Sequence, residues 1–239
     1  MADSSFIHIF NLGPDDWGWP MLRAAATTLS VATCGYILGA VIGMFGALAK
    51  LHVNRYLRLL AETYTTILRG IPDLLVIFFF YFGAGLALTA LARLLGKDGF
   101  ISLPGFVAGF LAIGIVAGAY HTEVMRAAIA AVSKGEIEAA TASGMKPSII
   151  LRRIIAPLAL RAALPGLGNV WQLVLKEAAL VSVTGVVELV RQSQMGAAAT
   201  RNPFVFFLAA GLLYLIITTA TGLGFGLAQS YFNRGMRRA

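Results

Sequence analysis

Two charged side chains lie deep inside long apolar stretches of this sequence, where charges are rare and usually functional. Arg69 precedes a Gly-Ile-Pro break in the second apolar stretch, and Glu177 lies in the fourth. An arginine can bind a carboxylate through two parallel hydrogen bonds, and a glutamate can face a cation. The two residues therefore predict a binding site for a small molecule that carries both a carboxylate and a cationic group.

Four further residues are predicted to surround that site. At the break, Gly70 and Pro72 leave backbone N–H and C=O groups without helical hydrogen bonds. Irregular backbone at membrane depth is expected to line a cavity. Tyr120 and Gln172 are predicted neighbours of the bound molecule.

The buried charge of Glu177 needs compensation when no ligand is bound. Lys176 or Arg69 is expected to neutralise it in the empty state, and a cationic ligand would then compete for that role. The alternative is that Arg69 and Glu177 pair only with protein groups.

Four other ionisable residues in apolar surroundings are candidates for a gate or for ion pairs: Glu62, Asp73, Glu123 and Arg126. Charges inside membrane helices usually pair with one another or line a water-filled path. Glu123 and Arg126 are about one helical turn apart, so these two charges can neutralise each other.

The composition is that of a membrane protein. Of 239 residues, 58% are hydrophobic and 13% are charged, and the mean hydropathy is +0.79. Soluble domains carry about 25% charged residues. Cys34, the only cysteine, lies inside the first apolar stretch and is predicted to be a small buried hydrophobe.

Several other chemistries find no support in the sequence. The histidines lack metal-ligand spacing, and there is no HExxH, GxSxG, Walker A or GxGxxG motif. An intramembrane enzyme is therefore disfavoured. The net charge of +8 could suggest a nucleic-acid partner, but membrane topology explains the cations better, and no nucleic acid is expected.

Five membrane spans are predicted, because roughly 20 apolar residues suffice to cross a bilayer as a helix. They cover residues 21–49, 56–95, 104–128, 162–183 and 203–231. The second is too long for one straight crossing, so it must tilt, break or leave the bilayer. Gly35, Gly39 and Gly43 recur every fourth residue in the first span, which lets another helix approach closely.

The basic residues are distributed unevenly about these spans. Thirteen of the 19 lie between spans one and two or early in span two, between spans three and four, or after span five. Positive loops stay in the cytoplasm, so a periplasmic segment is predicted at 1–20 and a basic cytoplasmic tail at 232–239. In this orientation Arg69 and Glu177 lie about 20 Å and about 22 Å from the cytoplasmic edge, at similar depth.

A compact helical loop is predicted between spans three and four. Ser133 and Glu136 fit a capping box, and Gly144 supplies a helix stop. A second short helix is expected over 149–155 and is expected to end at Pro157. Such a loop is either a docking element for another protein or an ordinary interfacial helix pair.

This loop resembles a known motif. Glu138, Ala139 and Ala140, followed by Gly144 and Pro157, are similar to the EAA motif of ABC importer permeases. In that family the loop, here residues 133–161, forms the coupling helix that sits in a cleft of the ATP-binding subunit. The resemblance implies an ATPase-coupling role for these five residues.

The resemblance extends over about residues 21–228. The runs Arg-Gly-Ile-Pro-Asp at 69–73 and Gly-Asn-Val-Trp-Gln at 168–172 look most like the Q-type permease of the histidine, lysine–arginine–ornithine and opine (octopine, nopaline) importers. His121 and Glu177 depart from residues that are frequent in that family, so the sequence does not identify the substrate.

The resemblance implies an all-α integral membrane protein of the bacterial inner membrane. Its fold would be the type I ABC importer transmembrane domain, over 21–231, with five transmembrane helices, the amino terminus outside and the carboxyl terminus inside. The expected function is to translocate a polar, basic amino acid or an opine-like derivative, and an ion-coupled secondary amino acid carrier is the alternative.

The resemblance also implies partners. They are a homologous second permease chain that completes a heterodimer, two ATP-binding subunits and a periplasmic substrate-binding protein, all at the lipid membrane. This chain is expected to bind no cofactor and to be no enzyme, since ATP and Mg²⁺ would bind to the partner ATPase.

Overall fold

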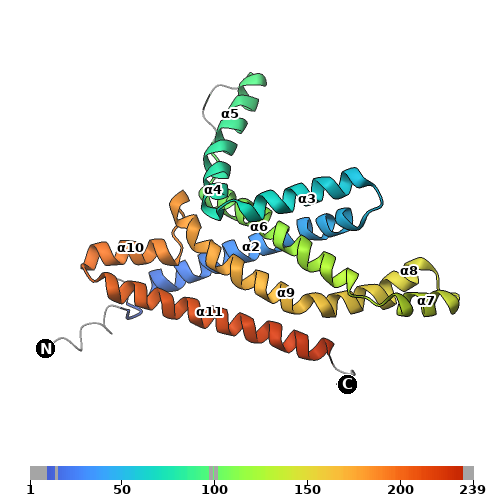
Figure 1. The fold of residues 1–239 in the computed structure, drawn as a ribbon. Helices are drawn as coiled ribbons and strands as arrows, with labels where there is room; N and C mark the ends of the chain where they lie inside the picture. The colour runs from blue at the N-terminus through green and yellow to red at the C-terminus, as the bar shows by residue number, and fades with distance from the viewer. Residues whose placement is uncertain (1–9, 14–15, 97–98, 100–101, 234–239) are drawn as a thin grey trace. The chain divides into compact units, whose positions relative to one another are not determined.

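The computed structural model describes residues 10–13, 16–96, 99 and 102–233, and every regular element in that part of the chain is helical (Figure 1). The α-helices are α2 (Gly18–Leu51), α3 (Arg55–Gly70), α4 (Asp73–Phe78), α5 (Ala84–Leu94), α6 (Gly105–Ala130), α7 (Lys134–Ala142), α8 (Pro147–Ile150), α9 (Ala156–Glu177), α10 (Leu189–Thr200) and α11 (Pro203–Phe232). They are joined by the π-helices η1 (Phe79–Gly83) and η2 (Leu151–Ile155) and by the 3₁₀-helix η3 (Ala178–Thr184). The predicted all-α class is confirmed for the described residues, and the arginines of the predicted basic tail lie outside them.

Four helical segments are long and apolar enough to cross a membrane: Gly18–Leu51, Asp73–Leu94, Gly105–Ala130 and Pro203–Phe232. They correspond to the first, second, third and fifth predicted spans. The predicted fourth span coincides with α9 and η3. That segment is not among the four, because α9 carries polar and charged side chains along its length.

The long second stretch is interrupted where the sequence predicts a break. α3 ends at Gly70, Ile71 adopts an extended backbone (φ −94°, ψ 137°), and α4 starts at Asp73 after Pro72. Proline causes this interruption, because it lacks a backbone N–H and restricts the residue before it to extended conformations.

The chain forms two compact units. The first unit comprises Met1–Gly35, Pro72–Ile113 and Leu173–Ala220. Its core is built around Phe206, which is fully buried and packs with Met21 and Leu189. The rings of Phe10 and Trp17 meet Phe206 edge to face, at centroid distances of 5.2 and 5.3 Å. These aromatic contacts fix the starts of α2 and α11 in the same core.

The second unit comprises Tyr36–Ile71, Gly114–Gln172 and Thr221–Ala239. Here α2 packs closely on α6 at the predicted glycine positions. A Cβ atom added to Gly43 would lie 2.2 Å from the Cβ of His121, and one added to Gly39 would lie 2.8 Å from the Cβ of Ala117. Only glycine permits this approach, so the predicted packing role of these glycines is confirmed.

The prediction for Cys34 is wrong, since this residue is exposed. The reason is its phase on α2. Val31 and Ala32 are fully buried, and a Cβ on Gly35 would touch Ile113, so Cys34 falls on another side of the helix from the one that packs.

The loop between α6 and α9 holds the two predicted short helices. α7 starts after Ser133, but the Ser133 side chain makes no capping hydrogen bond, so the predicted capping box is not formed. α7 ends at a left-handed Gly144 (φ 76°). The N–H groups of Gly144 and Met145 donate to the carbonyls of Thr141 (3.0 Å) and Ala140 (3.2 Å). This pair of bonds is a Schellman motif, and it confirms the predicted helix stop.

The predicted end of the second short helix is wrong. α8 starts at Pro147, two residues earlier than expected, and the chain remains helical through Pro157 into α9. The five residues before Ala156 form a π-helix. Its wider turn shifts the hydrogen bonding and makes room for the proline ring, which would otherwise clash with a carbonyl one turn earlier.

Candidate functional site

Arg69 and Tyr120, two predicted binding residues, lie together in the second unit. The guanidinium carbon of Arg69 sits 5.4 Å from the centroid of the Tyr120 ring, a cation–π distance. Arg69 is exposed and makes no ion pair with any described residue. Gly70 beside it is also open, since an added Cβ would meet no atom within 4 Å. The ring thus orients a guanidinium whose N–H groups can bind a carboxylate.

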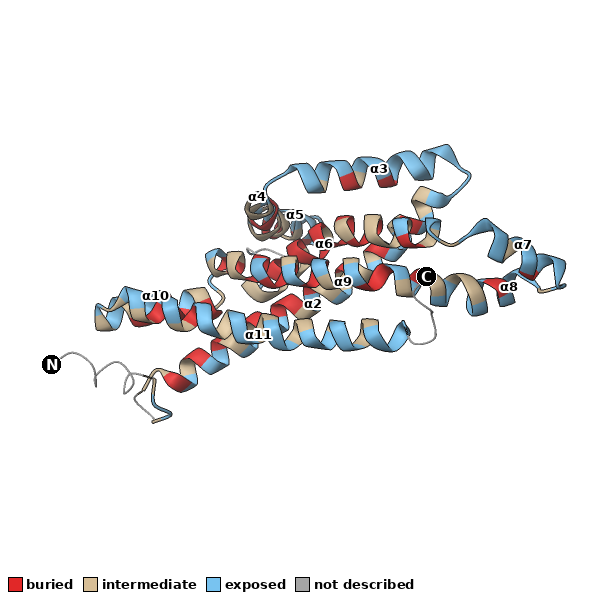
Figure 2. Ribbon diagram, turned by 60° about the horizontal axis from the view of Figure 1, so that its bottom comes forward, coloured by how far each residue is buried: buried red, intermediate tan, exposed pale blue. Residues whose placement is uncertain are grey.

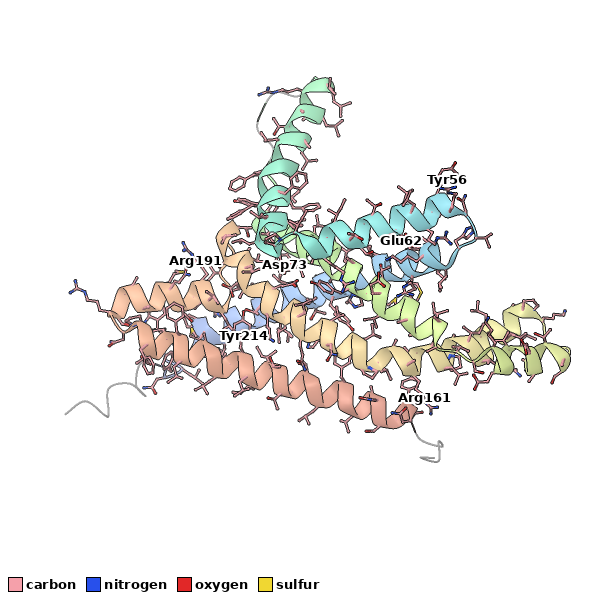
Figure 3. The ribbon with its side chains drawn as sticks, in the orientation of Figure 1. Tyr56, Glu62, Asp73, Arg161, Arg191 and Tyr214 are labelled. Carbon is pink, nitrogen blue, oxygen red and sulfur yellow. The ribbon has the colours of Figure 1, made fainter. Side chains whose placement is uncertain are left out.

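Glu177 and Asp73 lie together in the first unit. Glu177 is the last residue of α9 and is 5% exposed. Its charged neighbour is Asp73, the first residue of α4. Figure 3 labels Asp73. Neither carboxylate oxygen of Glu177 accepts a hydrogen bond from an N–H or from a neutral hydroxyl of the described residues, and the side-chain contact of Glu177 is with the Asp73 carboxyl. The predicted pairing of Glu177 with Lys176 is therefore not formed. Two acidic groups meet instead, and their charge must be balanced by a cation or by a proton that the two carboxyls share.

Two predicted binding residues remain. Pro72 precedes α4 in the first unit, and Gln172 lies elsewhere in the second unit. It lines a groove of about 220 Å³ with Asn169 of α9 and with Phe225 and Gln229 of α11. Tyr120 is not among the residues that line this groove. The predicted common depth of Arg69 and Glu177 stays a prediction, because the two residues belong to different units.

A network of charges joins three helices of the second unit. The ammonium group of Lys50 on α2 contacts the Glu123 carboxylate on α6 and donates to the Thr65 hydroxyl on α3 at 2.7 Å. The Nε of Arg126 donates to the other Glu123 oxygen at 3.0 Å. The predicted pair of Glu123 and Arg126 is confirmed. Lys50 was missed, because it lies 73 residues from Glu123 in the chain.

We expect Glu123→Gln to lower the free energy of unfolding by about 3 kcal/mol, because it leaves the Lys50 ammonium, whose side chain is 9% exposed, without its anion. Lys50→Met should have a similar effect, and the double variant should be less destabilised than the two single effects added together. Unfolding of the purified membrane protein in detergent measures all three. Lys134→Met, at an exposed cation on α7, is the control and should change little. Strictly additive effects would mean that the contact contributes no coupling.

Glu188 is a buried carboxylate that the sequence reasoning did not single out. It lies before α10 and accepts hydrogen bonds from the N–H groups of Val190 (2.9 Å) and Arg191 (2.7 Å). The Tyr214 hydroxyl donates to it at 3.5 Å. Burial raises the pKa of the Glu188 carboxyl, while these hydrogen bonds oppose the rise. Two of its partners are N–H groups at the start of α10 and the third is the Tyr214 hydroxyl of α11, so Glu188 is a structural cap and differs from Glu177.

The predicted coupling residues occupy an exposed helical loop of the second unit. Glu138 and Ala139 are exposed on α7, and Ala140 is buried. Gly144 is exposed at the turn, and Pro157 lies in the first turn of α9. Of these five residues, Ala140 is therefore the one that is buried, and the other four lie on the exposed surface of the loop.

Comparison with known proteins identifies the family. Residues 35–238 match the family described as the binding-protein-dependent transport system inner membrane component. The octopine transport system permease protein OccQ of Rhizobium meliloti is 52% identical over 233 residues, which is 98% of each chain. The histidine/lysine/arginine/ornithine transport system permease protein HisQ of Salmonella typhimurium is 41% identical over 219 residues, which is 92% of this chain and 96% of that protein.

Solved structures agree with this result. The crystal structure of an amino acid ABC transporter with histidines is similar, with a TM-score of 0.74, 30% identity, and coverage of 92% of this chain and 95% of that chain. The MetNI methionine ABC transporter has the same fold, with a TM-score of 0.71 at 19% identity, over 90% of this chain and 97% of that one. The chain therefore belongs to the family of binding-protein-dependent transport system inner membrane components, the inner-membrane permease subunits of ABC importers.

Proposed function

We propose that this permease translocates a polar, basic amino acid or an opine-like derivative. The observation that carries the proposal is the pair of neighbouring acids, buried Glu177 and Asp73, whose site lacks a cation among the described residues. A cationic side chain would supply it. Arg69, stacked on Tyr120, is suited to the carboxylate of the same class of molecule. The names of the relatives support this class, because octopine, nopaline and histidine/lysine/arginine/ornithine systems all carry such compounds.

The energy for translocation is proposed to come from partner subunits. The exposed α7–α8 loop, with Glu138, Ala139 and Gly144, would dock into an ATPase that binds ATP and Mg²⁺, and a periplasmic binding protein would deliver the substrate. A homologous second permease chain would complete a heterodimer. The groove that Gln172 lines supports such a neighbour, because Gly222 and Gly226 of α11 also line it and Cβ atoms added to them would meet nothing within 4 Å.

Reconstituted complexes test this function directly. With binding protein and ATPase present, uptake of a basic amino acid should require ATP and should be inhibited by vanadate, while a protonophore should leave it unchanged. The opposite pattern would favour an ion-coupled carrier, which the family membership of the chain already argues against.

The proposed topology has five membrane-spanning segments, with α9 as the fourth and the amino terminus in the periplasm. Thirteen of the 19 basic residues form the clusters that would be cytoplasmic, and all of them except Arg69, which lies deeper in the second span, support this orientation. Reporter fusions at Lys97 and at Lys146 should therefore report opposite sides of the membrane. Signals from the same side would overturn the five-span arrangement.

A further inference from the structure

α3 is an unusual helix for a membrane protein, because Figure 2 shows it exposed along nearly its whole length. Only Ala61 and Thr65 are buried, at 7% and 2% exposure. On the same side, the Tyr64 hydroxyl donates to the Ile115 carbonyl at 2.5 Å. One narrow face of α3 therefore holds it on the second unit, and the other faces are left uncovered by the described residues.

The uncovered surface is divided into two faces of different chemistry. One is apolar, with Tyr56, Leu60 and Ile67 exposed by 71%, 67% and 48%. The other, which we call the charged face, consists of Arg55, Arg58, Glu62, Thr66 and Arg69, all exposed. Successive members are three or four residues apart, so they are neighbours about 5–6 Å apart along one side of the helix.

The charges of this face are not paired within the chain. In the described part of the chain, none of the three guanidinium groups has a carboxylate within salt-bridge distance. The Glu62 carboxylate likewise has no described Lys or Arg group within that distance. The face is about 21 Å long. The apolar face can contact lipid. Unpaired charges over about 21 Å cannot, because charged side chains inside membranes face water-filled cavities or pair with one another. The charged face therefore borders water or a charged ligand.

Arg69, the proposed carboxylate contact, stands at one end of this face and Arg55 stands at the other. The one negative charge of the face, Glu62, lies between Arg69 and Arg58 (Figure 3 marks Glu62 on α3). A basic amino acid also carries charges of both signs at its two ends. Passage through a pore requires several sites that bind weakly enough to release. The spacing of about 6 Å from Glu62 to Arg58 offers such a site next to Arg69.

We propose that the charged face of α3 forms a wall of the substrate path. Glu62 and Arg58 make a second, transient binding site for the substrate, which we call the station, between Arg69 and the start of α3 at Arg55. The carboxylate passes from Arg69 to Arg58, and Glu62 holds the cationic group during that step. The inference rests on the proposed function, since it needs a substrate with charges of both signs.

Cysteine accessibility tests the wall without any need to know the substrate. Cys34 is the only cysteine, so Cys34→Ser gives a cysteine-free chain. Single cysteines are then placed on the charged face (Arg58→Cys, Thr66→Cys) and on the apolar face (Leu60→Cys, Ile67→Cys) in the full complex in inside-out vesicles. We expect a charged methanethiosulfonate to label the charged face at least about tenfold faster, because only a hydrated thiol ionises.

Two labelling outcomes would overturn the proposal. Equally slow labelling of both faces would mean that a partner chain or lipid headgroups cover the charged face. Equally fast labelling of both would mean that α3 lies in bulk water and borders no path.

The station has a separate functional test. Glu62→Gln and Arg58→Gln should lower ATP-driven uptake several-fold, and Arg58→Lys, which retains the charge, should restore most of it. Unchanged uptake in both neutral variants would overturn the station even if the wall is labelled as expected. Failure of the proposed function is distinguishable, because the unsubstituted complex would then take up no basic amino acid while the labelling pattern stood.

Discussion

Replacing Glu177 by Gln should lower uptake of a cationic substrate by roughly ten- to a hundredfold, which corresponds to the loss of one charge-assisted contact. The substitution keeps the shape of the side chain and removes its charge. Glu177 is 5% exposed, and its side-chain neighbour is the Asp73 carboxyl. The amide N–H₂ of glutamine can still donate to the Asp73 carboxylate, so this neighbour keeps a partner and the loss of uptake reports on the ligand.

The selectivity of this effect is its main signature. Uptake of a neutral analogue, such as citrulline or glutamine, should fall much less than uptake of a basic amino acid. Arg69→Lys should behave differently and weaken all substrates with an α-carboxylate, because lysine cannot reproduce the bidentate arrangement of hydrogen bonds. The measurement is reconstituted uptake with saturating binding protein, which compares both substrate types in both variants.

Glu188→Gln is the matched control for Glu177→Gln. It removes a buried carboxylate of the same unit, but one with backbone and Tyr214 partners inside the protein. Any loss of uptake in this variant should be equal for cationic and neutral substrates. Equal losses for both substrate types in Glu177→Gln would mean that Glu177 is structural as well. The cation site would then have to be sought at Asp73 or in the partner chain.

The features that the sequence predicts correctly depend on local backbone chemistry. The end of α3 before Pro72 and the left-handed Gly144 are each determined by a single residue type and its immediate neighbours. The close approach at Gly43 belongs to the same class, since only the absence of a side chain permits it.

The features that escape prediction depend on residues that are distant in sequence or on an adjustable backbone. Lys50 reaches Glu123 only after α2 and α6 have packed, and Asp73 becomes a neighbour of Glu177 only in the folded first unit. Pro157 was expected to end a helix, but a π turn before it absorbs the steric clash. Periodicity and propensity contain no information on such contacts.

Gly144→Val should abolish most of the ATP-driven uptake while the protein still inserts into the membrane. Gly144 has a φ of 76° and closes α7 through the bonds from its own N–H and that of Met145. A β-branched side chain in this conformation costs about 1–2 kcal/mol or more. A cost of this size changes the population of the native loop roughly 5- to 30-fold. Uptake and substrate-stimulated ATP hydrolysis in the reconstituted complex are the measurements.

Two controls separate backbone strain from other effects of this substitution. An added Cβ at Gly144 meets nothing within 4 Å, so the defect must come from the backbone angle and not from a clash. Gly144→Asn should therefore retain most of the uptake, because asparagine tolerates the left-handed conformation. Gly135→Val, on the same helix but at an ordinary φ, should also be mild. If ATPase binding and substrate-stimulated hydrolysis survive Gly144→Val intact, the turn does not position the loop, and the contact with the ATPase must be made by residues that do not depend on it.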